Sequence, residues 1–268
     1  MIRAAPLRRR CLLAVLLLSP LLASPARASS GEWDGYPLQV IDRPLSLPQG
    51  MAQATPGISL NLGSGSALQP SYPGVSVSYG ATNDLTLSGA LDLCVNGGGA
   101  CAGAANDAGV LGTYTFDKSG PSAMAFTLGF NFTAFSPKIE LAIPAGVLFR
   151  YTVAPGLFAV LVNPQFSIAL TDRTTVQFDS FTAPFAFQLQ ATPHMMVQAT
   201  LAFTLPVDQP EPLTADKTLF GAVGAGAIWS ITNLLDVGCA FAFTNLLGKG
   251  PTQGPDGRTL NLFVAWRL

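Results

Sequence analysis

The sequence predicts an all-β fold, a transmembrane antiparallel up-and-down β-barrel of about twelve strands, within a range of roughly ten to fourteen. Three observations predict it. Large apolar residues alternate with polar or small ones from residue 51 to the C-terminus, and only 11% of the residues are charged. Beyond the first 28 residues, no apolar run is continuous over the ~20 positions that a membrane-spanning helix needs. Together these features indicate strands whose two faces meet different environments.

The first 28 residues have the three-part layout of a secretory signal peptide. Residues 1–10 carry four arginines and no acidic residue, an apolar run follows at 11–23, and the segment ends in Ala26-Arg27-Ala28. The apolar run is well short of the ~20 residues of a membrane anchor. We therefore expect cleavage before Ser29, with residues 29–50 as a periplasmic N-terminal lead-in and 51–268 as the barrel.

The charge of the chain excludes some classes of function. Five of the 14 basic residues and none of the 15 acidic residues lie in the first 28 positions, so the mature chain has a net charge of about −6. Nucleic-acid binding is disfavoured, because phosphate contacts need basic clusters. The charged fraction is less than half of the ~25% that is usual in soluble domains, which indicates that much of the surface faces something other than water.

Alternation at period two recurs from end to end and defines the expected strands. The alternating segments are 58–62, 75–79, 85–93, 110–116, 126–132, 139–151, 158–170, 185–189, 195–205, 237–243 and 260–268. Residues 218–231 also read as a strand, although without a clean apolar face. Segments of about ten alternating residues between turn residues are typical of transmembrane barrels.

Two other architectures fit the sequence less well. A bundle of membrane helices would need long apolar runs, but the best candidates, 151–171 and 218–235, are interrupted by glycine, asparagine or proline. A soluble β-sandwich also alternates, but its outward face would carry Lys, Glu and Asp where this chain has Ser, Gly, Ala and Thr. A closed barrel satisfies every backbone group in lipid without long apolar runs.

Turn residues predict which rim of the barrel each connection occupies. Short turns begin at Thr82, Thr192 and Thr232, whereas long polar connections cover 63–74, 96–108, 207–216 and 248–257. Short turns suit the periplasmic rim and long ones the outer rim. The segment "TDRTTV" from Thr171 resembles the short turns, yet counting strands back from the C-terminus places it outside.

Two places predict irregular strands. Pro144 and Pro164 fall inside expected strands, where a closed barrel needs every N–H. If "VAPG" at 153–156 is their hairpin turn, the two prolines lie at nearly the same height, which predicts a local bulge. The apolar face also changes side between Phe178 and Phe185, which predicts a bulge or a split strand there.

The last ten residues carry the sharpest signal. The apolar face of this final strand consists of Leu260, Leu262, Val264, Trp266 and Leu268. With this strand, the chain resembles the bacterial outer-membrane β-barrel proteins of the porin-like and small transporter-like type, over roughly residues 51–268. The resemblance implies a place among outer-membrane lipids and a final strand that is read by the barrel-assembly machinery. Such strands usually end in Phe, where this chain has Leu268.

The single histidine, His194, is the first candidate for a catalytic base. His194 lies in an expected periplasmic turn with no obvious partner, whereas a catalytic triad needs a base held against its nucleophile. No paired carboxylates in a repeated motif, metal-ligand cluster or phosphate-binding loop is present in the sequence. We therefore expect no enzymatic activity, no cofactor and no metal.

The cysteines indicate one disulfide. Cys94 and Cys101 flank a glycine-rich outer loop on the exported side, which predicts a disulfide between them. Cys239 falls on the lipid-facing side of its strand.

The function is expected in the lumen. The candidate lumen or constriction residues are Asp92, Lys138, Glu140, Arg150 and Asp236. Glu140 and Arg150 share a strand face, either to line a constriction or as a structural pair. A barrel of about twelve strands is wider than one filled by its own side chains. We therefore expect a passive channel for small solutes, or alternatively a non-conducting structural or surface-interaction barrel whose outer loops bind a partner. The sequence leaves open the solute and the oligomeric state.

Overall fold

The computed structural model describes residues 35–62, 69–93, 105–133, 140–171, 179–207, 220–247 and 257–268. A short 3-10 helix, η1 (Val40–Asp42), precedes the strands. The strand segments are β1 (Ala52–Asn61), β2 (Gln69–Gly80), β3 (Leu85–Leu93), β4 (Ala105–Asp117), β5 (Ser122–Thr133), β6 (Glu140–Ala154), β7 (Phe158–Val162), β8 (Gln165–Ala169), β9 (Ser180–Thr192), β10 (Met195–Pro206), β11 (Phe220–Thr232), β12 (Leu235–Leu247) and β13 (Arg258–Arg267). No helix within the described ranges is long and apolar enough to cross a membrane.

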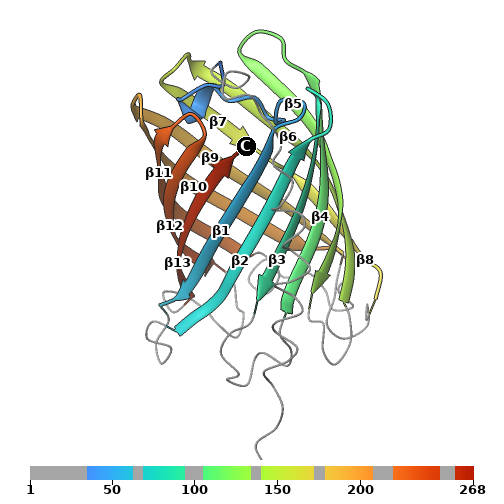
Figure 1. The fold of residues 1–268 in the computed structure, drawn as a ribbon. Helices are drawn as coiled ribbons and strands as arrows, with labels where there is room; N and C mark the ends of the chain where they lie inside the picture. Colours follow the sequence, from blue (N-terminus) through green and yellow to red (C-terminus); the bar gives the residue numbers. More distant parts are fainter. Residues whose placement is uncertain are drawn as a thin grey trace, which may run out of the picture. The chain divides into compact units, whose positions relative to one another are not determined.

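The strands form one closed antiparallel barrel (Figure 1). Neighbours in sequence are neighbours in the sheet, and β13 pairs with β1, for example Trp266 with Ala54 and Leu260 with Leu60. Segments β7 and β8 both lie between β6 and β9, so they are two parts of one strand. The barrel therefore has twelve strands, which confirms the predicted fold.

The break between β7 and β8 is not the predicted bulge. Phe149 pairs with Val162 and Gly146 with Gln165, so the register against β6 is the same on both sides of the break. The ladder is interrupted because Pro164 has no N–H to donate, while its carbonyl still accepts a hydrogen bond from Val147 N at 3.1 Å. Pro144 pairs with Ser167, so the two prolines are not level. The prediction of a shared bulge was wrong.

The bulge or split predicted between Phe178 and Phe185 is absent from the described part of this range, Ser180 to Phe185. Strand β9 pairs with β10 without a register shift from Ser180 to Gln190. Phe181 and Phe187 are both exposed on the outside, so the outward face is continuous. Phe178, at the other end of the predicted change of face, lies outside the described residues.

The alternation separates an apolar outside from a lumen wall of small and polar side chains. Leu87, Leu128 and Trp266 are about half exposed on the outside, whereas their inward neighbours Thr86 and Thr127 are buried. Strand β11, whose face was unclear from the sequence, exposes Val223, Trp229 and Ile231 outward. Its inward side carries mostly small residues, namely Ala222, Gly224, Gly226, Ile228 and Ser230.

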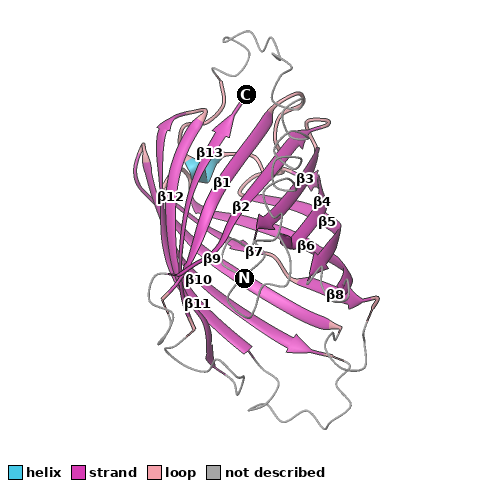
Figure 2. Cartoon of the chain, turned by 60° about the horizontal axis from the view of Figure 1, so that its bottom comes forward, coloured by secondary structure: helices cyan, strands magenta, loops and turns pink. Residues whose placement is uncertain are grey.

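The short turns that the structure describes lie at one end of the barrel, the short-turn end, where β1 begins and β13 ends (Figure 1). The strand ends that border the gaps between the described ranges lie at the opposite end, which Figure 2 turns toward the viewer. Most of "TDRTTV", residues 172–176, lies outside the described residues, so its position on the outer side stays a prediction. Glu140, at the start of β6, lies at the end of the barrel opposite the short turns.

Candidate functional site at the short-turn end of the barrel

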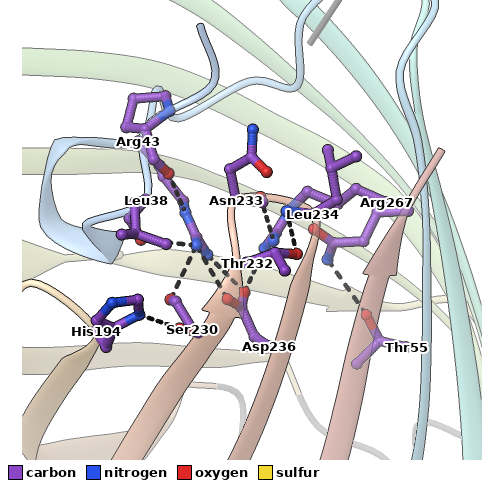
Figure 3. Close-up of polar contacts among 12 residues, drawn as sticks. Leu38, Arg43, Thr55, His194, Ser230, Thr232, Asn233, Leu234, Asp236 and Arg267 are labelled. Carbon is purple, nitrogen blue, oxygen red and sulfur yellow. Dashed lines mark hydrogen bonds and ion pairs between the residues drawn. The ribbon is translucent and has the colours of Figure 1, made fainter. Parts of the chain in front are cut away.

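The chain ahead of β1 lies in the bore at the short-turn end. Residues 36–50, here called the mouth segment, contact inward side chains on separate parts of the wall. Ile41 N donates to Gln190 Oε1 on β9 at 3.4 Å, and Leu47 N donates to Thr86 Oγ1 on β3 at 2.7 Å. Arg43 reaches Asp236 on β12 (Figure 3). The segment therefore crosses the bore from one side of the wall to the other.

Asp236 is the centre of the polar contacts in this mouth. Arg43 binds its carboxylate through two hydrogen bonds, from Nη1 to Oδ2 at 2.5 Å and from Nη2 to Oδ1 at 3.0 Å. Arg267 on β13 donates from Nη2 to Oδ2 at 2.7 Å. All three side chains are more than nine-tenths buried. A buried charge is tolerated only when paired and hydrogen-bonded, and the two guanidinium groups meet this need for Asp236.

Arg43 also organises the mouth segment itself. Its Nε donates to Pro37 O and its Nη2 to Leu38 O, both at 3.0 Å, so the side chain ties the segment into a compact turn. Nη2 also donates to Ser230 Oγ on β11 at 3.0 Å. One side chain thus folds the segment and attaches it to two strands.

Tyr36 lies between the two arginines. The centre of its ring is 5.6 Å from Arg43 Cζ and 5.3 Å from Arg267 Cζ, within the range of cation–π contacts. Burial raises the pKa of the Tyr36 phenol above its ordinary value, more than the nearby Arg267 lowers it. The ring therefore stays neutral at physiological pH and covers both cations.

The other end of the mouth segment joins the β2–β3 side of the wall through its backbone. Gly50 N donates to Gly80 O at 2.8 Å, and Gly80 N donates to Met51 O at 2.9 Å. A Cβ on Gly80 would lie 2.7 Å from Leu47 O and closer still to Pro48 O, so only glycine permits this approach. Ser46 Oγ adds a bond to Asn83 O at 2.8 Å.

The mouth segment also provides the apolar core of this end. Ile41 is 1% exposed, and Met51 and Met196 are fully buried. Burying a side chain of this size contributes ~1.5–3 kcal/mol. The largest fully buried side chains in the described residues, Ile41, Met51, Met196, Asp236, Ser46 and Ser230, all belong to this region.

The structure separates the predicted lumen residues. Arg150 faces the bore beside the mouth segment, where its Nη1 donates to Arg43 O. Glu140 lies ten residues away on the same strand, about 33 Å by strand geometry, so the two do not share a constriction. Asp236 is buried under two arginines. Asp92 lies farther along the bore, directly opposite Asp107 in the register of β3 and β4.

Other predicted residues fall outside this site. Lys138, Cys94 and Cys101 lie outside the described residues. Cys239 is a free, exposed cysteine on the outer face. His194 lies in the β9–β10 turn, where its Nδ1 is 2.7 Å from Ser230 O and its ring stacks on Trp229. These contacts attach the turn to β11.

Sequence reasoning missed the roles of Tyr36 and Arg43. Residues 29–50 were expected as a periplasmic lead-in ahead of the barrel, and residues 36–50 of this lead-in contact inward side chains of the wall. One signal was available. Asp236 was assigned to the inward face, and a carboxylate there needs a cationic partner, while Arg43 is the only basic residue between position 29 and β1.

Among the described residues, several hollows lie in the bore beyond the mouth segment. One has a volume of about 400 Å³ and is lined on the segment side by Arg43 and Leu45, and on the wall side by Thr55, Ser88 and Arg150, among others. The second, of about 330 Å³, is lined by Ser59, Ser76, Asp92 and Asn261, among others. Both contact Thr55 and Phe263. The inner wall therefore offers hydroxyl, amide and charged groups to whatever occupies the bore.

A closed barrel that is apolar outside and polar inside is the architecture of outer-membrane β-barrel proteins. Solved structures of this class have the same fold. The NanC porin matches with a TM-score of 0.59 at 8% identity, over 81% of this chain and 100% of that chain. The KdgM porin matches with a TM-score of 0.56 at 7% identity, over 80% and 98% of the two chains.

An outer-membrane channel from Pseudomonas putida F1 is also similar, with a TM-score of 0.53 at 13% identity, over 83% of this chain and 97% of that chain. At these identities the likeness shows the fold alone. No protein-family model and no curated protein sequence matches the chain.

Proposed function

We propose that this protein is a passive channel for small solutes in the bacterial outer membrane. The observation that carries the proposal is the hollow of about 400 Å³ inside a closed wall, which hydroxyl, amide and charged side chains line together with apolar ones. Eight-stranded barrels are filled by their side chains, whereas twelve strands leave room. Small inward residues such as Gly224, Gly226 and Ala240 widen the bore further. The porin and channel structures of the same fold support this reading.

The proposed orientation follows from the connections. Short turns suit the periplasm and long loops the outside, so the mouth segment would narrow the periplasmic end. The signal peptide ending near Ala28 would deliver the chain to the periplasm, and the strand from Leu260 to Leu268 would be read by the assembly machinery. A disulfide between Cys94 and Cys101 would close an outer loop.

Conductance in planar lipid bilayers tests the proposal. Purified, refolded protein should produce discrete current steps, and vesicles containing it should swell in small neutral solutes faster than empty vesicles. Folding is checked by the different gel migration of unheated and boiled samples. If the folded protein carries no current under any applied voltage and causes no swelling, and a folded barrel without residues 36–45 is equally silent, the channel proposal fails.

The mouth segment gives a specific reason to keep the non-conducting alternative. It fills part of the bore with buried groups, including Ile41 and Arg43. In that case the outer loops, and not the bore, would carry the function by binding a partner. The bilayer experiment separates the two functions directly. The catalytic alternative has no support from the turn position of His194, and we propose no enzymatic role.

A further inference from the structure

We propose that the mouth segment is a hinged gate. In this proposal, which rests on the channel function above, the end that contains Tyr36 and Arg43 detaches from the wall while the end at Gly50 and Met51 stays in place. The movement opens the short-turn end of the bore. The gate is built from the chain's own residues 36–50.

The hinge end is held by backbone and is continuous with β1. Gly50 has φ of +85°, a conformation that glycine adopts without strain. Its N–H donates to Gly80 O, and the Gly80 N–H returns a bond to Met51 O. These bonds lie next to the first residue of β1, so they fix the point about which the rest of the segment can turn.

The free end is held differently. In the described structure, the backbone–backbone hydrogen bonds of residues 36–45 are internal to the segment, such as Arg43 N to Val40 O at 3.2 Å. Its attachments to the wall go through side chains, namely Arg43 on Asp236 and Ser230, Gln190 on Ile41 N, and Arg150 on Arg43 O. No strand ladder has to break for this end to leave.

The wall tolerates the loss of Arg43 because Asp236 has a second partner. Arg267 holds the same carboxylate oxygen, Oδ2, at 2.7 Å. Removing the only partner of a buried charge is strongly unfavourable, but here Asp236 stays paired when Arg43 moves away. Arg43 meanwhile moves into water, where its charge is well solvated. The contact between Arg43 and Asp236, here called the latch, can therefore open without leaving an isolated buried carboxylate.

Opening the gate would connect a hollow inside the bore to the short-turn end of the barrel. The hollow of about 400 Å³ lies directly against the segment, with Val40, Arg43, Pro44, Leu45 and Leu47 on one side. Its other side is the polar wall that includes Thr55 and Ser88. Movement of the free end therefore removes one side of this hollow and joins it to the short-turn mouth.

The test compares single-channel currents of wild type, Arg43→Met and a deletion of residues 36–45. Arg43→Met removes the latch but leaves Arg267 on Asp236. We expect a several-fold rise in mean current for Arg43→Met, and a larger, steady conductance with fewer closures for the deletion. Both should also admit larger polymers into the bore.

Lys118→Met is the matched control. It removes the same charge from the same rim, where Lys118 Nζ pairs with Asp84 at 2.5 Å and both side chains are 48% exposed. Lys118 also donates to Asn83 O, which Ser46 binds at the hinge end of the mouth segment, so the variant leaves the contacts of the Arg43 end in place. Its currents should equal those of wild type. If gel migration shows that Arg43→Met does not fold, Gln190→Leu takes its place. This variant removes the acceptor for Ile41 N, and we expect the same several-fold rise in mean current.

The outcomes separate the two proposals. If wild type, latch variant and deletion are folded and conduct equally, the gate is refuted and the channel stands. If the deletion barrel is folded and still carries no current, the channel proposal fails and the gate with it. Rising currents in the latch variant and deletion, with the control unchanged, support the gate.

Discussion

The ring of Phe263 lies directly over Gly238, its partner across β12 and β13. A Cβ on Gly238 would fall 2.6 Å from Phe263 Cε1 and closer still to Cζ. Glycine at this position is therefore what allows a large aromatic ring to lie against the inner wall of the barrel.

Gly238→Ala should destabilise the barrel by ~1–3 kcal/mol, the usual cost of overpacking. Adding Phe263→Leu should recover part of the loss, because the smaller side chain can move away. Urea unfolding in lipid vesicles measures both. Gly89→Ala is the control, since its Cβ would meet nothing nearer than Gly109 O at 3.9 Å. Equal losses at Gly89 and Gly238 would refute the contact.

Leu128→Arg should cost ~2–4 kcal/mol, because the side chain is on the lipid-facing side near the middle of β5. Leu87→Arg should cost less, since Leu87 is only two residues from the start of β3 at the short-turn rim. Ser88→Arg faces the bore beside the larger hollow and should be the mildest. Unfolding free energies in vesicles decide the order, and a reversed order would contradict the assigned faces.

Asp236→Asn should destabilise the short-turn end by ~3–5 kcal/mol, because it leaves two buried arginines without their carboxylate. Lys118→Met, which breaks an exposed pair, should change stability by no more than ~1 kcal/mol. Thermal unfolding followed by gel migration compares the two. A similar small change in both variants would mean that burial adds nothing to the Asp236 pairs.

Arg150→Glu should shift ion selectivity toward cations in a conducting barrel, because the side chain faces the bore. The reversal potential in a salt gradient measures the shift. The structure adds a second effect, since the variant also loses the donor to Arg43 O and should loosen the mouth segment. Arg150→Gln is the matched variant that removes the charge but keeps a donor. An unchanged reversal potential in both variants would place Arg150 outside the ion path.

Deleting residues 259–268 should abolish the barrel. Strand β13 pairs with both β12 and β1, so its loss opens two edges, where each unpaired backbone group in lipid costs several kcal/mol. Trp266→Ala should reduce the yield of folded protein without eliminating it, because the remaining apolar face is intact. Cell-fractionation blots measure both, and folded barrel from the deletion variant would refute the closing role of β13.

The barrel itself was predictable because the face on which each side chain lies depends only on its position along its own strand. Alternation at period two assigns each side chain to a face, and the assignments of Leu128 and Cys239 to the outside hold in the structure. The strand count followed from turn residues such as Thr82 and Thr232. The irregularities were less predictable, since whether Pro164 shifts the register depends on its neighbours β6 and β9.

The mouth of the barrel could not be predicted in the same way. Arg43 and Asp236 are 193 positions apart, and no periodic pattern links a segment without regular structure to a strand end. The interpretation of 29–50 as a periplasmic lead-in named no contact between this segment and the barrel. Its short apolar and proline-containing sequence instead packs Ile41 into the bore, a contact that only the closed barrel creates.

The same three side chains have a consequence for the order of assembly. Arg43 precedes the first strand, whereas Asp236 and Arg267 lie on the last two strands, so their cluster straddles the line along which β1 and β13 close the ring. The hinge end of the mouth segment can bind β2 and β3 as soon as these strands form, but Arg43 has no carboxylate partner until β12 is in position. The contact between Arg43 and Asp236 therefore forms late, and its formation reports that the end of the chain has joined the barrel.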